Sequence, residues 1–125
     1  MVWVAVREHS EVANSRNELL AFDNDGNPKQ TIALGEKGPF HVSIDGRDGA
    51  VWLTLFGHSV RCYTPEGKLE GEYKMHALTA EADPRGGGGA WVVTPEETVL
   101  LSRKGAISSR VKHKGKTSQA WIAAW

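Results

Sequence analysis

The sequence predicts an all-β fold built from repeated sheets, and three observations support this prediction. Apolar and polar residues alternate with period two, and β-branched and aromatic residues are frequent, through most of the chain. No stretch of helical length carries apolar residues at 3.6-residue spacing, and glycine and proline recur frequently from Gly26 onward. Similar segments recur at intervals of about 40 residues, which is typical of repeat architectures.

One strand of each repeat carries a tryptophan at its second position. Large flat rings at a repeated position are suited to filling the space between packed sheets, so we expect Trp3, Trp52 and Trp91 in the core. The three segments are "VWVAV" (2–6), "VWLTL" (51–55) and "AWVVT" (90–94).

A hairpin is expected after each tryptophan strand. Its turn contains Gly26, Gly67 or Gly105, and glycine supplies the positive φ that tight hairpin turns need. The hairpins are 19–34, 60–75 and 99–114.

A further strand precedes the second and third tryptophan strands, as "FHVSID" (40–45) and "LTAEAD" (78–83). The loops that follow, "GRDG" and "PRGGGG", lead into strands rather than helices, which favours hairpin connections over phosphate-binding loops. The end of the chain, "SQAWIAAW" (118–125), matches these two strands. No such strand precedes Trp3.

Composition limits the class of protein. A chain of 125 residues predicts one domain. No apolar run approaches the ~18 residues that span a bilayer, and "MVWVAVREHS" lacks the pattern of a secretion signal. The single Cys62 cannot form an internal disulfide and is expected to be a buried structural thiol rather than a nucleophile. These features favour a cytoplasmic protein.

Charge is unevenly distributed although the net charge is zero. No acidic residue follows Glu97, whereas six lysines and arginines do. Arg110, Lys112 and Lys114 alternate with Val111 and His113, as one face of a solvated outer strand would. Two alternatives remain open: attraction between unlike halves of neighbouring chains, and a nucleic-acid surface.

Four antiparallel strands per repeat of about 40 residues indicate the blades of a β-propeller. The segment "GPFHVSIDGRDGAVWLTLFGHSVRCYTPEGKLEGEY" resembles the blades of the NHL and streptogramin (virginiamycin B) lyase propellers, and gluconolactonase-like propellers are similar at this level. His41 departs from the family pattern, which often has glycine there. The matching residues are Pro39, Val42, Asp45, Trp52, Pro65 and Gly67.

The strand count predicts three permuted blades in one half-propeller domain, 1–125. Two blades are complete, 39–75 and 77–114, while 2–34 lacks an inner strand. Because propellers close with roughly four to eight blades, we expect a six-bladed homodimer. Strand 118–125 of one chain would pair with the Trp3 strand of its partner.

Ligands of propellers bind at the mouth of the central channel, where the inner strands converge. A binding or interaction propeller without chemistry is the preferred interpretation. The resemblance implies a lyase- or lactonase-like enzyme with a channel metal such as magnesium as an alternative, and a nucleic-acid binder is the third. No zinc or serine-hydrolase pattern occurs. The channel candidates are His41, Ser43, Thr79, Glu81, Gln119 and Trp121.

Overall fold

The computed structural model describes residues 1–8, 16–35 and 37–123, and in this part of the chain all regular structure is antiparallel strand. The predicted all-β class is confirmed. Eleven strands form three sheets, ordered β1-β2-β3, β4-β5-β6-β7 and β8-β9-β10-β11. The strands are β1 (Val2–Val6), β2 (Asn17–Phe22), β3 (Pro28–Gly35), β4 (Pro39–Ile44), β5 (Val51–Leu55), β6 (Ser59–Tyr63), β7 (Leu69–Lys74), β8 (Thr79–Ala82), β9 (Ala90–Val93), β10 (Glu97–Leu101) and β11 (Ile107–Lys112).

The hairpin turns follow the predicted glycine positions. Gly26, Gly67 and Gly105 have φ angles of 84°, 86° and 86°. This is the left-handed region, which other residues adopt only with strain. The three glycines therefore set the same turn in each of the three sheets.

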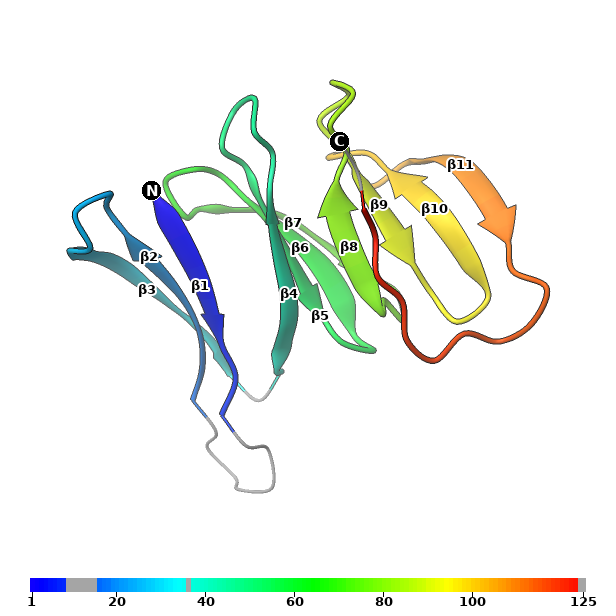
Figure 1. The fold of residues 1–125 in the computed structure, drawn as a ribbon, viewed down its shortest axis with the longest axis horizontal. Helices are drawn as coiled ribbons and strands as arrows, with labels where there is room; N and C mark the ends of the chain where they lie inside the picture. Colours follow the sequence, from blue (N-terminus) through cyan, green and yellow to red (C-terminus); the bar gives the residue numbers. More distant parts are fainter. Residues whose placement is uncertain (9–15, 36, 124–125) are drawn as a thin grey trace.

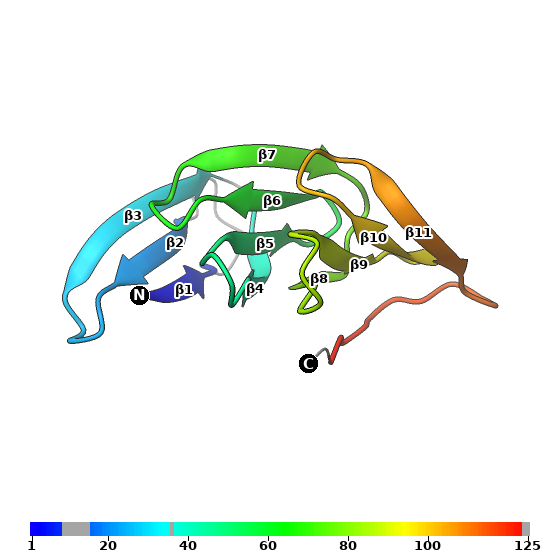
Figure 2. The same ribbon diagram turned by 90° about the horizontal axis from the view of Figure 1, so that it is seen from above.

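The three sheets stand side by side in an arc (Figures 1 and 2). β1, β4 and β8 lie along the inside of the arc, and β3, β7 and β11 lie along its outside (Figure 2). The chain leaves each of the first two sheets by its outer strand and enters the next sheet by the strand on the inside.

Two apolar cores fill the two spaces between the sheets. Trp52 is fully buried in the core between the second and third sheets, as predicted. Trp3 is partly buried in the core between the first and second sheets. Trp91 is half-buried, and the guanidinium of Arg85 lies 5.2 Å from its ring centre.

The first sheet has three strands where the others have four. Trp3, Trp52 and Trp91 lie on β1, β5 and β9, so the first sheet lacks the counterpart of β4 and β8. The strand expected over 118–125 is not formed within this chain, since residues 113–123 belong to no strand and 124–125 lie outside the described residues. Trp125 therefore has no described position.

Within the ranges given above, no helix has the length and apolar character that crossing a bilayer as a helix requires.

Candidate functional site

Three of the predicted residues meet at the inside of the arc, where β4 and β8 lie next to each other. The Glu81 carboxylate accepts a 2.6 Å hydrogen bond from the Ser43 hydroxyl through Oε1. Its other oxygen, Oε2, lies 3.0 Å from His41 Nε2. An ionised carboxylate only accepts hydrogen bonds, so His41 donates here. We call His41, Ser43 and Glu81 the inner cluster.

Strand register brings these side chains together. Ser43 is opposite Trp52 and Glu81 is opposite Trp91, so the two residues hold the same position in successive repeats. Ser43 also accepts a 3.0 Å hydrogen bond from the backbone N–H of Ala82. The Ser43 hydroxyl is thus buried and acts both as a hydrogen-bond donor and as an acceptor, and these two bonds hold β8 against β4.

The inner cluster holds one carboxylate in a defined orientation. Nucleophilic catalysis by serine needs a base that takes the proton of the hydroxyl, and such a base is usually histidine. Here Glu81 lies between Ser43 and His41, so the histidine does not contact the hydroxyl in question. The arrangement is suited to presenting a negative charge at a partly exposed position, since the side chains of His41 and Glu81 are 40% and 29% exposed.

The other three candidates do not join the inner cluster in the single chain. Thr79 is buried on β8 opposite Val93. Gln119 and Trp121 are exposed on the C-terminal segment. No group of three or more His, Cys, Asp or Glu side chains suited to a metal occurs in the described part of the chain.

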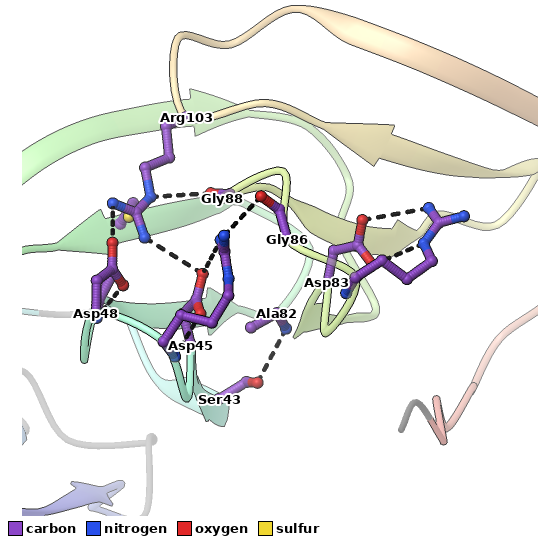
Figure 3. A network of polar contacts seen from close by, with 12 residues as sticks. Ser43, Asp45, Asp48, Ala82, Asp83, Gly86, Gly88 and Arg103 are labelled. Atoms are coloured by element: carbon purple, nitrogen blue, oxygen red, sulfur yellow. Dashed lines mark hydrogen bonds and ion pairs between the residues drawn. The ribbon is translucent and has the colours of Figure 1, made fainter.

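A polar network between the second and third sheets was not predicted (Figure 3). Arg103, after β10, bonds to Asp48 at 2.6 Å, to the buried Asp45 at 3.4 Å and to the Gly88 carbonyl at 2.9 Å. Arg47 pairs with Asp45 at 3.2 Å and donates to the Gly86 carbonyl. The network ties the β4–β5 turn to the loops of the third sheet, and we call it the loop clamp.

Arginine hydrogen bonds in and next to the loop clamp lower the pKa values of aspartates. The hydrogen bond from Arg103, followed by that from the Ala50 N–H, lowers the pKa of Asp48 to about 2. The hydrogen bond from Arg85 likewise lowers the pKa of Asp83. An aspartate after each inner strand, in "FHVSID" and "LTAEAD", was the available sequence signal for this network.

Cys62 is a buried residue of the core next to Trp52, as expected for a structural thiol. Burial raises the pKa of its thiol to about 12. Because the thiolate is the reactive form, such a thiol is a poor nucleophile near neutral pH.

The basic third of the chain lines an open depression of about 480 Å³ on the outer side of the third sheet. Two acidic residues, Glu96 and Glu97, lie in the same depression, and Glu97 pairs with Arg110. The positive charge is therefore partly neutralised within the chain itself.

Comparison with known proteins gave no relative: no family model matches the chain, and no curated protein matches it. The resemblance to NHL and streptogramin-lyase blades consequently stays a prediction from the residues.

Proposed function

We propose that this chain is half of a six-bladed ring, that two copies close the ring head to tail, and that the ring binds a ligand at the channel mouth beside the inner cluster. One observation carries the proposal: the inner face of β4 lacks the cover that the matching face of β8 has. The three sheets would serve as blades, and the C-terminal segment of each chain would supply the inner strand missing from its partner's first sheet.

The two inner strands differ in how their apolar side chains are covered. On β8 and just before it, Leu78 and Ala82 are 2% and 8% exposed, and β8 contacts the neighbouring inner strand β4. The matching residues of β4, Phe40 and Ile44, are 47% and 43% exposed. Among the described residues, no strand of the first sheet occupies the place that β4 occupies for β8. An inner strand paired with β1 would cover both residues.

The C-terminal segment has the length and direction that such a strand requires. Connections from an outer strand to the next inner strand run from Gly35 to Pro39 and from Lys74 to Thr79. After β11 the segment passes β8 on the side away from the second sheet (Figures 1 and 2). It thus runs, for a third time, from an outer strand toward the inner strand of a next sheet. In the proposed ring that next sheet is the first sheet of the partner.

Backbone hydrogen bonds support a matching path for the chain where it leaves the outer strand. The His113 N–H donates to the Glu96 carbonyl at the β9–β10 turn, as the Met75 N–H donates to the His58 carbonyl at the β5–β6 turn. His113 therefore corresponds to Met75, and the segment after β11 begins as the connection from β7 to β8 does.

The end faces of the arc are also apolar. Val2, Val4 and Val6 are exposed on the first sheet, whereas Val51 and Leu53, at matching places on the second, are fully buried. The opposite end presents the half-buried Trp91 and the exposed Val111. Exposed apolar surface of this kind favours association, and two such junctions should bury more than the ~1,600 Å² of a standard interface.

A binding role fits the inner cluster better than catalysis does. Its three polar side chains hydrogen-bond to one another, which fixes the carboxylate, and the buried Ser43 hydroxyl is held by both Glu81 and the Ala82 N–H. The depression near the basic third contains two glutamates, which weakens the case for nucleic acid.

Sedimentation velocity of the whole chain and of two matched variants tests the assembly. We expect a dimer with twice the 13.6 kDa chain mass. Ile44→Asp should dissociate the dimer, because it places a charge under the partner's strand. Leu69→Asp is the control, since Leu69 is 48% exposed on the outer strand β7. A monomeric whole chain, or an Ile44→Asp variant as dimeric as the control, would contradict the proposal.

A further inference from the structure

The loop clamp between the second and third sheets shows how one sheet docks on the next. The turn between β10 and β11 reaches the turn between β4 and β5, where Arg103 bonds to Asp48 and to Asp45. Arg47 pairs with the same Asp45 oxygen, Oδ2, so the two guanidinium groups lie close together. In the proposed ring, the partner's β2–β3 turn approaches the β8–β9 loop of the third sheet in the same way.

Hydrogen bonds of the two hairpin turns show which residues correspond. In each turn the N–H of the glycine with positive φ, Gly26 or Gly105, donates to the carbonyl three residues earlier. Counted from these glycines, Asn24 holds the place of Arg103. The first hairpin therefore presents a neutral amide between two carboxylates where the third hairpin presents a cation.

The β8–β9 loop differs from the β4–β5 turn in the complementary sense. Asp83 and Arg85 repeat the pair of Asp45 and Arg47, since each arginine donates from Nη2 to Oδ2 of its aspartate at 3.2 Å. The β4–β5 turn then continues with Asp48, whereas "DPRGGGG" has no second acidic residue. The end of the third sheet thus lacks the acid, and the first hairpin lacks the cation, of the 2.6 Å ion pair in the loop clamp.

Arg85 lies where the partner's turn would arrive. Its guanidinium is 5.2 Å from the ring centre of Trp91, on the end face of the third sheet, and its side chain is 63% exposed. In the loop clamp, Arg103 reaches the carboxylate oxygen that binds Arg47, so the same approach brings the first hairpin to Arg85. Asp25 in that hairpin is exposed and forms no ion pair with another described residue.

We infer that Arg85 forms an ion pair with the partner's Asp25, so that each chain supplies the cation at one junction and the carboxylate at the other. This inference rests on the proposed function and names the residues by which the two chains recognise each other. Arg85 attracts the acidic turn of a first sheet and repels the cationic Arg103 turn of a third sheet. The pair therefore selects the head-to-tail arrangement rather than adding much affinity.

Charge reversal at the two ends of the pair tests the inference by sedimentation velocity. Arg85→Glu and Asp25→Lys should each raise the dissociation constant of the dimer about tenfold or more, because both junctions then hold like charges. An equimolar mixture of the two variants should recover the dimer to within about threefold, because both junctions of the mixed dimer hold opposite charges. Single variants as dimeric as the unchanged chain, or a mixture no more dimeric than its components, would overturn the inference.

Matched variants control for charge and folding. Glu66→Lys reverses the acid at the same turn position of the second hairpin, and Lys68→Glu reverses an exposed cation there, so neither should alter the dimer. Lys104 stands at this position in the third hairpin, which shows that the turn accommodates lysine. If circular dichroism shows Arg85→Glu to be unfolded, Arg85→Gln combined with Asp25→Lys replaces it. This double variant should dimerise more tightly than Asp25→Lys alone, since the repulsion is removed, and an unchanged dimer would overturn the inference.

The unchanged chain distinguishes the two proposals. If it stays monomeric, the ring is contradicted, and with it the ion pair across the junction. If it is a dimer that both charge reversals leave intact, only the ion pair is contradicted.

Discussion

The second and third sheets meet in a closed junction, whereas the third sheet has an open face made of matching residues. At the closed junction Trp52 is fully buried, Arg103 bridges two aspartates, and Glu81 is held by His41 and Ser43. At the open face, the matching tryptophan, Trp91, is only half-buried. The same repeat position thus has two environments, and the difference lies in whether a neighbouring sheet is present.

The comparison extends to the strands on the inside of the arc. Leu78, just before β8, is 2% exposed, whereas Phe40 at the matching place on β4 is 47% exposed, although its ring packs against Phe56 of the same sheet. Apolar residues at both ends of the arc are what the proposed ring of two copies requires. The variants below change residues of the closed junction, the open face or the outer strand, and their effects on unfolding free energy or assembly are compared.

The tryptophans give the largest expected effect. Trp52→Ala should lower the free energy of unfolding by about 3–5 kcal/mol, because it leaves a large cavity in a packed core. If a partner's first sheet covers Trp91, Trp91→Ala should cost a similar amount in urea unfolding of the dimer. A Trp91→Ala cost well under half of that for Trp52→Ala would show that the face stays open.

The loop clamp gives the next effect. Arg103→Gln removes the charge that bridges Asp48 and Asp45, and we expect a loss of about 1–3 kcal/mol of unfolding free energy. Arg85→Gln is the comparison, since Arg85 is mostly exposed and pairs with Asp83 within one loop. Exposed pairs contribute roughly 0–1 kcal/mol. If the two variants lose equal unfolding free energy in thermal or urea unfolding, the bridge between two sheets adds no stability beyond that of an exposed pair.

The sequence predicted the strands because alternation, turn glycines and the tryptophan position are local features. Gly67 sets its turn through its own φ angle, and Trp52 is buried because of its place on β5. The inner cluster was predicted in part, since strand register places Ser43 and Glu81 at matching positions of the inner strands β4 and β8. The loop clamp was not, because Arg103, which bonds to both Asp45 and Asp48, lies far along the chain and next to another sheet.

The C-terminal segment shows a second limit of prediction from sequence. Residues 118–125 match inner strands in sequence, yet a strand forms only where another strand pairs with it. Residues 118–123 pair with no strand of the described part of the chain and stay outside any strand. The pattern alone predicts the strand, and in the proposed ring the edge that pairs with it comes from a second copy.

Acid should weaken the closed junction through Asp48. Its pKa is about 2 in the folded chain and 3.8 in the reference state, so its stabilising effect is present above about pH 4. That effect should be lost as the pH falls toward 2. Asp48→Asn should flatten the decline in unfolding free energy over this range, measured by urea unfolding at several pH values. The lowered pKa of Glu72, caused by Arg61, should preserve some of the decline in the variant. If the unfolding free energy of the Asp48→Asn variant declines as steeply between pH 4 and pH 2 as that of the unchanged chain, the ionised Asp48 does not contribute to the stability of the loop clamp.

The basic outer strand should show the smallest effect. Arg110, Lys112 and Lys114 are exposed, and Arg110 pairs with Glu97 at the surface, so replacing all three by glutamine should change the unfolding free energy by less than about 1 kcal/mol. The dimer should also survive, because the junction faces are apolar. Fluorescence anisotropy with labelled DNA and RNA at low and high salt provides the second measurement, since phosphate contacts weaken steeply as salt rises. Tight, salt-sensitive binding that the triple variant loses would make this strand a nucleic-acid surface. A large loss of dimer in the variant would instead show that charge attraction between unlike halves of neighbouring chains helps to hold the ring.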